Sequence, residues 1–144
     1  MMDEQKRQSA LVFERLYTQN ELDLAASLFH PQYAQKPIGY SGLDGIRRHV
    51  SELRAGFPDL RCELIDQIGE NDGVVNLVLM TGTHTGTLYE QIPPTGRAVM
   101  VMTIIIHRFV DGLIVEGVVS MDQLSMFQQL GVVPRPAWAG TSGG

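Results

Sequence analysis

Residues 99–109 are mainly hydrophobic, and many of them are β-branched. Such a run is typical of a strand that is covered on both faces. Asp111 and Gly112 then supply a turn, and a second apolar run extends over residues 113–121. The pattern predicts a β-hairpin at the centre of a sheet.

Two registers are open for this hairpin. A three-residue loop over residues 111–113 sets Arg108 opposite Glu116 and Ile105 opposite Val119, whereas a two-residue loop sets His107 opposite Glu116. We favour the first register because opposite charges across a strand pair contribute roughly 0.2 to 1 kcal/mol. Since side chains alternate between the two faces, one face then carries, among others, Thr103, Ile105, His107, Val119 and Met121.

Both faces of the hairpin are largely apolar, so each needs a cover. Helices can cover one face, and a second copy of the chain can cover the other. We therefore expect a homodimer that forms through the sheet.

The rest of the chain shows helical patterns first, then strand patterns, and one last helical pattern after the hairpin. Apolar spacing predicts helices over residues 3–18, 20–29 and 45–55, the third capped by Asp44, and a last helix over 123–130. Alternation predicts strands over 60–68 and 74–88, and residues 30–44 suit a loop or short edge strand. Gly82 and Gly86 mark a bend in the second of these strands. We expect an α+β fold in which helices pack on a strongly bent antiparallel sheet.

Length and composition narrow the class of protein. The 144 residues fit one domain over residues 1–133 followed by a tail over 134–144. A net charge of -5 without a basic run argues against nucleic acid or an anionic membrane as partner. We expect a cytoplasmic protein, because the N-terminus lacks the apolar core of a signal peptide and no apolar run is long enough to span a bilayer. The only cysteine, Cys62, fits a small core residue, and the spacing of the four histidines predicts no metal site.

Five short motifs occur in order along most of the chain. They are Phe57-Pro-Asp-Leu60, Gly82-Thr-His-Thr-Gly86, Pro93-Pro-Thr-Gly-Arg97, Arg108-Phe-Val-Asp-Gly112, and Asp122 followed by Gln129-Leu-Gly131. Together they resemble the SnoaL-like polyketide cyclases. The resemblance implies the cone-shaped α+β fold shared with nuclear transport factor 2 and ketosteroid isomerase, with a pocket between sheet and helices. It also implies an intramolecular aldol ring closure, without metal or cofactor, on an apolar carbonyl-bearing molecule such as an aromatic polyketide.

The residues that carry proton transfer in the resembled family are replaced in this chain. Counted from the shared Asp111-Gly112 turn, the family's aspartate falls on Val119 and its histidine on Ile105. Two aliphatic side chains cannot move a proton. A hydrogen-bonding residue that family members place after the first loop corresponds to Gln35.

Other residues are therefore candidates for the chemistry. His107 lies one step along the same face from Ile105, where an apolar wall would keep it neutral and able to act as a base; alternatively, a backbone carbonyl or solvent satisfies it. His84 lies between glycines that leave room for a ligand, or else on an exposed strand face. Asp122 is a third candidate, or a helix cap. The expected substrate-binding residues are Tyr33, Gln35, Phe57, Ile105, Val119 and Met121.

Three functions remain open at this point. The first is an enzyme that performs acid-base chemistry in the pocket. The second is a pocket that binds a small hydrophobic molecule without reaction. The third is a dimeric scaffold, whose interior would be filled by its own side chains.

Overall fold

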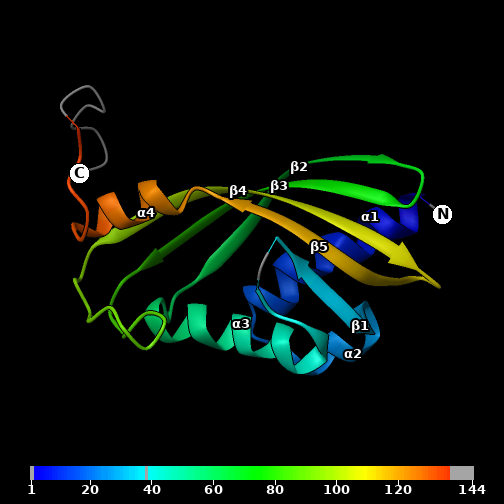
Figure 1. Ribbon diagram of the computed structural model, residues 1–144, viewed down its shortest axis with the longest axis horizontal. Helices are drawn as coiled ribbons and strands as arrows, with labels where there is room; N and C mark the ends of the chain where they lie inside the picture. The colour runs from blue at the N-terminus through cyan, green and yellow to red at the C-terminus, as the bar shows by residue number, and fades with distance from the viewer. Residues whose placement is uncertain (1, 38, 137–144) are drawn as a thin grey trace.

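Four consecutive strands follow a mainly helical N-terminal part and precede one last helix, in the predicted α+β order (Figure 1). The computed structural model describes residues 2–37 and 39–136. The N-terminal part contains α1 (Met2–Leu11), the π-helical η1 (Val12–Tyr17), the 3-10 turn η2 (Leu22–Leu24), α2 (Ala25–Leu28), β1 (Phe29–Lys36) and α3 (Gly42–Gly56). The remainder contains β2 (Arg61–Glu70), β3 (Gly73–Thr83), β4 (Ala98–Val110), β5 (Leu113–Met121) and α4 (Gln123–Leu130).

Five strands form one sheet in the order β1-β5-β4-β3-β2. The strands β2 to β5 pair antiparallel, as the sequence predicts. At the remaining edge, β1 pairs parallel with β5, and it extends over eight residues where a loop or short edge strand was expected. The sheet curls over α3, and the cone-shaped fold is confirmed (Figure 1).

The central hairpin has the favoured register. Arg108 pairs with Glu116 and Ile105 with Val119. The turn differs from the expected one, because Val110 pairs directly with Leu113 around a two-residue turn. A register shift between Arg108 and Phe109 restores the expected pairing beyond the turn, as a β-bulge does.

The predicted ion pair across this hairpin is wrong. Both residues are described, but no ion pair joins Arg108 to Glu116, and the guanidinium of Arg108 lies 3.4 Å from the carboxylate of Asp72. Asp72 belongs to the turn between β2 and β3, beside the hairpin. Asp72, in a neighbouring turn, therefore pairs with the guanidinium of Arg108 in place of Glu116, the partner expected from the sequence.

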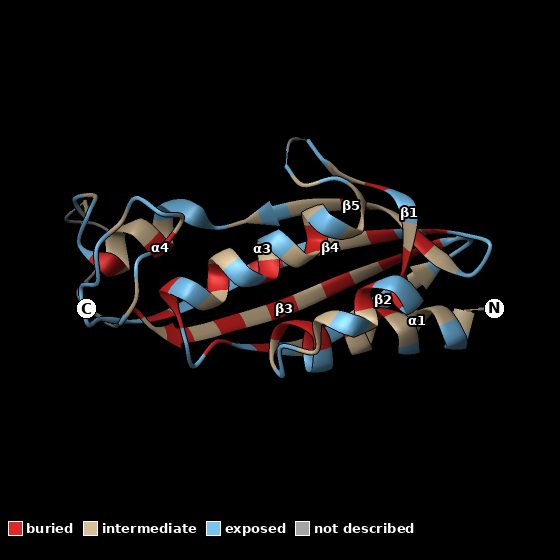
Figure 2. Cartoon of the chain, turned by 90° about the horizontal axis from the view of Figure 1, so that it is seen from below, coloured by how far each residue is buried: buried red, intermediate tan, exposed pale blue. Residues whose placement is uncertain are grey.

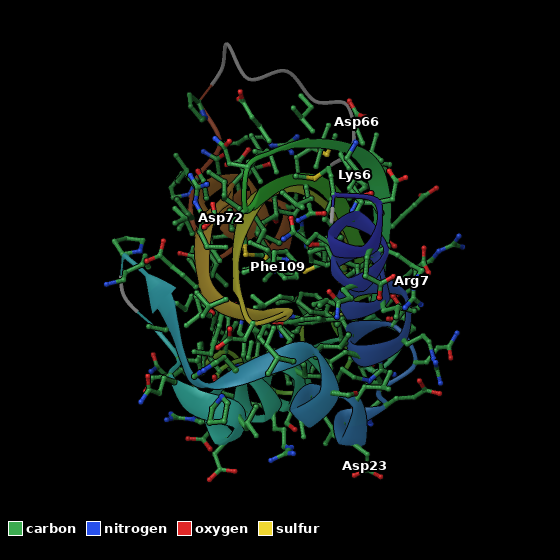
Figure 3. All side chains as sticks on the ribbon, turned by 90° about the vertical axis from the view of Figure 1, so that its right-hand side faces the viewer. Lys6, Arg7, Asp23, Asp66, Asp72 and Phe109 are labelled. Carbon is green, nitrogen blue, oxygen red and sulfur yellow. The ribbon has the colours of Figure 1, made fainter. Side chains whose placement is uncertain are left out.

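Burial alternates along β3 and β4, so the sheet has an inner and an outer face (Figure 2). The inner face packs on the helices and carries Val74, Val78, Val101 and Phe109, all buried. Figure 3 shows Phe109 within the space that the curled sheet, α1 and the segment from α2 to β1 surround. The outer face keeps large apolar side chains exposed, among them Met100, Met102 and Ile104.

One helix boundary and one strand end differ from expectation. The N-cap position of α3 is Ser41, so Asp44 lies in the first turn and is not the cap. Strand β3 ends at Thr83 and does not continue to residue 88. The space that a side chain would need at Gly82 is taken by Phe57, and at Gly86 by the backbone carbonyl of Ala55. These glycines therefore let the end of α3 approach the sheet.

Most of the expected tail over residues 134–144, including Trp138, lies outside the described residues. In the described part of the chain, no helix has the length and apolar character needed to cross a membrane.

Candidate functional site

A cavity of about 530 Å³ lies between the inner face of the sheet and the helices. Its wall is mainly apolar and aromatic, with residues from η1, β1, α3, β3, β4 and β5. Five of the predicted binding residues line it: Tyr33, Gln35, Ile105, Val119 and Met121. An interior filled by its own side chains, as the scaffold alternative expects, is not what the structure shows.

His107 lines this cavity from β4 and is only 2% exposed. Its ring stacks on Phe13 with a centroid distance of 5.7 Å and meets Phe29 edge-on at 6.2 Å. Burial lowers the pKa of His107 to about 3 because these apolar surroundings penalise the charged form. The imidazole is therefore neutral across the physiological range.

The two ring nitrogens of His107 have different surroundings. Nδ1 lies 2.8 Å from the hydroxyl of Ser9 on α1 and 3.5 Å from the side-chain amide of Asn76 on β3. Nε2 makes no hydrogen bond within the described part of the chain, and it is not one of the fully enclosed unpartnered atoms there. Nε2 is thus the nitrogen that is left to face the cavity.

A second histidine, His49 on α3, lines the same cavity. Its Nδ1 lies 2.7 Å from the hydroxyl of Tyr17, and its ring lies against Tyr40 at a centroid distance of 4.6 Å. Burial lowers the pKa of His49 to about 4, although the charge of Glu52 opposes this shift. Burial raises the pKa of Tyr17 well above its usual value. Both members of the pair are therefore uncharged at neutral pH.

Tyr40 closes one side of the cavity next to His49. Its hydroxyl donates to the carboxylate of Glu52, which Arg48 also contacts at 2.8 Å. Burial and this carboxylate both raise the pKa of Tyr40. These contacts attach the loop after β1 to α3.

The aromatic rings form a row along one wall. From His107 to Phe13, from Phe13 to Tyr17 and from Tyr17 to His49 the successive centroid distances are 5.7, 6.4 and 5.6 Å. The row has an imidazole at each end. It offers flat apolar contact between two groups that can form hydrogen bonds or exchange protons.

Tyr33 lines the cavity from β1. Its hydroxyl lies where a side chain at residue 117 would project, so Gly117 leaves room for it. Burial raises the pKa of Tyr33, and the charge of Glu116 adds to the effect. The phenol is therefore a neutral hydrogen-bonding group in the cavity wall.

Three predicted residues are not among those that line the cavity: His84, Phe57 and Asp122. His84 is buried, its Nδ1 lies 2.9 Å from the Thr95 hydroxyl, and its ring packs on Phe57. The glycines beside it accommodate α3 and do not open space for a ligand. Asp122 caps α4, where its Oδ1 accepts a hydrogen bond from the backbone N–H of Ser125 at 3.1 Å.

Among the described residues, no three histidine, cysteine, aspartate or glutamate side chains lie close enough together to hold a metal ion. Cys62 lines the cavity, and burial raises the pKa of its thiol to about 12. A thiol with so high a pKa is a poor nucleophile at neutral pH.

Comparison with known proteins agrees with this architecture. A model of the SnoaL-like polyketide cyclases matches residues 8–130. The chain belongs to the SnoaL-like polyketide cyclase family. No curated protein matches the sequence at a significant level.

Solved structures of SnoaL-like and related proteins superpose over most of the chain. TsrD from Streptomyces laurentii is 25% identical with a TM-score of 0.78, covering 91% of this chain and 95% of its own. A candidate SnoaL-like polyketide cyclase from Jannaschia sp. CCS1 is 20% identical with a TM-score of 0.83, covering 92% and 95%. AclR from Streptomyces galilaeus, a candidate hydroxylase, is 25% identical with a TM-score of 0.81, covering 96% and 88%.

This SnoaL-like cavity has aliphatic side chains at the two positions that the resemblance equates with catalytic residues. Ile105 and Val119 pair directly across the hairpin, and both line the cavity. The two imidazoles lie elsewhere in the wall, on β4 at His107 and on α3 at His49. Any proton transfer in this cavity must therefore use a different set of residues.

Sequence reasoning missed His49, Tyr17, Ser9 and Asn76. Helical spacing holds a signal for His49, because it lies three residues after Ile46 and four before Leu53, on the face that α3 buries. Asn76 interrupts an apolar alternation on the buried face of β3. No local pattern identifies Ser9, whose contact with His107 spans 98 residues of sequence.

Proposed function

We propose that this SnoaL-like protein binds an apolar, carbonyl-bearing molecule in the cavity and catalyses acid-base chemistry on it. An intramolecular aldol-type ring closure is the reaction that the family resemblance suggests. The observation that carries the proposal is the pair of neutral imidazoles, His107 and His49, at the two ends of an aromatic wall inside one cavity.

The chemistry of ring closure explains why two such groups are useful. One group must take a proton from the carbon that becomes the nucleophile, and another must stabilise the charge that develops on the attacked carbonyl oxygen. A neutral imidazole contains one nitrogen that accepts and one that donates, so it can serve either need. Hydrogen bonds to the developing charge are stronger next to a mainly apolar wall than in water.

The cavity also suits the proposed class of molecule. Phe13, Tyr17, Phe29 and Tyr33 supply aromatic surface, and Ile105 and Val119 add aliphatic surface. Gln35 is a further hydrogen-bonding residue in the wall. A molecule that is mainly apolar but carries oxygens near its ends would match this distribution.

Turnover assays with cavity variants test the proposal. Purified protein is incubated with a panel of linear and partly cyclised aromatic polyketide esters, and products are followed by mass spectrometry. We expect His107→Leu and His49→Leu each to slow turnover by about 100-fold or more. His30→Leu, a change of the same type outside the cavity, serves as the matched control. Full turnover in both cavity variants would remove the assignment.

The second candidate function is binding without reaction, favoured by one specific observation. Ile105 and Val119 leave the family's acid-base positions without a titratable group. Calorimetric titration with the same panel distinguishes the two functions. Tight binding without any product would favour a binding protein, and its affinity should fall when Val119→Asp introduces a charge into the cavity wall.

A further inference from the structure

A chain of side-chain hydrogen bonds connects the backbone of α1 to the ring of His107. The side-chain amide nitrogen of Gln67 on β2 lies 2.8 Å from the carbonyl oxygen of Lys6 and 3.0 Å from Oδ1 of Asn76. Asn76 Nδ2 lies 3.2 Å from the carbonyl oxygen of Ile105 and 3.5 Å from Nδ1 of His107. The hydroxyl of Ser9 reaches the same nitrogen at 2.8 Å.

The directions of these hydrogen bonds are determined by the groups at their ends. A backbone carbonyl can only accept, so the atoms facing Lys6 O and Ile105 O are the amide nitrogens of Gln67 and Asn76. The Oδ1 atom of Asn76 then accepts from Gln67. The same Nδ2 atom also lies 3.4 Å from the carbonyl oxygen of Val74, so its two hydrogens are shared among two carbonyls and Nδ1 of His107. Toward Nδ1 this amide nitrogen can only donate.

Nδ1 of His107 is consequently an acceptor. A hydroxyl can donate or accept, so its chemistry alone would allow either state of Nδ1. Nδ1 is, however, the only hydrogen-bond partner of the buried Ser9 hydroxyl among the described residues, so the hydrogen of this hydroxyl has an acceptor only if Nδ1 carries a lone pair. A lone pair there also faces the amide nitrogen of Asn76, which can only donate. Because His107 is neutral, its one ring proton is then on Nε2. This is the nitrogen without a partner among the described residues, on the side of the cavity.

We propose that Ser9, Asn76 and Gln67 hold His107 in the tautomer with the proton on Nε2, so that His107 acts toward the cavity as a hydrogen-bond donor and not as a base. In this arrangement Nε2–H binds the carbonyl oxygen of the substrate and stabilises the negative charge that develops on it. The base is then left to the His49 and Tyr17 pair. Ser9, Asn76 and Gln67 are positioning residues, since they act through His107.

The burial of the positioning residues supports this role. Ser9 and Asn76 are fully buried, and both lie against the ring rather than at the surface. They reach Nδ1 from α1 and β3, and Gln67 on β2 holds the amide of Asn76. Figure 3 shows α1 lying along the edge of the curled sheet.

Nitrogen NMR of the ligand-free protein tests the tautomer directly. Histidine is labelled with ¹⁵N, and the signals of His107 are assigned by their loss in His107→Gln. We expect Nδ1 to resonate as an unprotonated nitrogen and Nε2 as a protonated one at pH 7. A protonated Nδ1 in the wild-type protein would overturn the proposal, whether or not the protein has activity.

Asn76→Asp reverses the direction of the key hydrogen bond with almost no change in shape. A carboxylate at this place accepts from Nδ1–H, so we expect the proton to appear on Nδ1 of His107. Asn71→Asp makes the same chemical change in the exposed turn before β3 and should leave the His107 signals as in the wild type. If Asn76→Asp does not fold, Ser9→Ala provides the second test, with partial loss of the Nε2–H form expected. Unchanged spectra in both variants would contradict the proposal.

The role assigned to His107 rests on the proposed function, and kinetics separate it from a role as base. His107→Gln can keep an N–H donor near the position of Nε2, whereas His107→Leu cannot. A donor role predicts that His107→Leu slows turnover by about 100-fold or more and that His107→Gln recovers part of this loss. Equal losses in the two variants would overturn the donor role. Absence of turnover in the wild type would remove the proposed function but leave the NMR result standing.

Discussion

Burial of His107 makes the stability of the protein depend on pH. The pKa of His107 is lowered to about 3 in the folded chain, whereas an unfolded chain binds the same proton near pH 6.5. Between these values only the unfolded state is protonated, so the free energy of unfolding falls as the pH drops and rises as the pH increases. The contribution of His107 is fully present above about pH 6.5.

We therefore expect acid to destabilise the wild-type protein by roughly 1 kcal/mol for each pH unit below 6.5 through this residue alone. Urea unfolding at pH 7, 6 and 5 measures the slope. His107→Gln removes the titrating group and should give a shallower dependence. An identical slope in the two proteins would show that His107 titrates normally in the folded state.

Gly86 explains how the connection between β3 and β4 approaches the end of α3. A methyl group at this position would overlap the backbone carbonyl oxygen of Ala55, which cannot move without disturbing α3. We expect Gly86→Ala to lower the free energy of unfolding by about 1 to 3 kcal/mol. Thr87→Ala, an exposed neighbour, is the control for thermal denaturation. Equal melting temperatures for the two variants would contradict this explanation of the glycine.

Asp122 caps α4, so we expect it to contribute to stability and not to catalysis. Its carboxylate accepts from the N–H of Ser125 and lies outside the cavity lining. Asp122→Ala should therefore destabilise the protein by about 1 kcal/mol without a change in the rate of turnover per folded molecule. Asp44→Ala makes the same change in the first turn of α3, where the side chain is exposed and caps nothing, and should have little effect. A strong loss of turnover in Asp122→Ala at full stability would restore Asp122 as a catalytic candidate.

The elements that the sequence predicted well are those whose apolar pattern is decided locally. The alternation in β4 and β5 and the positions of Arg108 and Glu116 predicted the register of the hairpin correctly, although Arg108 pairs with Asp72 and not with Glu116. The same register predicted that His107 shares a face with Ile105 and Val119, which line one cavity. Local pattern is therefore sufficient to assign residues of the central hairpin to the cavity wall.

Elements that depend on distant partners were predicted less well. Strand β1 contains Pro31 and several polar residues, so its sequence suggests a loop, and it becomes a strand by pairing parallel with β5 more than 80 residues later. The hydrogen bonds around His107 also depend on distant residues, since Ser9, Gln67 and Asn76 come from three elements. The sequence therefore identified His107 as a candidate, but it did not identify the residues that orient its ring.

The outer face of the sheet determines how copies of the molecule are expected to associate. Met100, Met102 and Ile104 project from β4 with exposed fractions of 62%, 44% and 46%, and Ile68 on β2 is 66% exposed. A contiguous apolar surface of this kind on a single chain is typical of an interface. The inner face is already occupied by the helices and the cavity, so association through the outer face leaves the cavity intact.

We accordingly predict a homodimer in which two sheets meet through their outer faces. Light scattering after size exclusion should give about twice the chain mass of 15.9 kDa. Ile104→Lys places a charge in the centre of the predicted interface, and we expect it to yield monomers, because an unpaired charge buried between apolar surfaces is strongly unfavourable. Circular dichroism of the variant must match that of the wild type, since only a folded monomer tests the interface. A monomeric wild type would contradict the predicted homodimer. A dimer that survives Ile104→Lys together with Met102→Lys would show that the interface does not lie on β4.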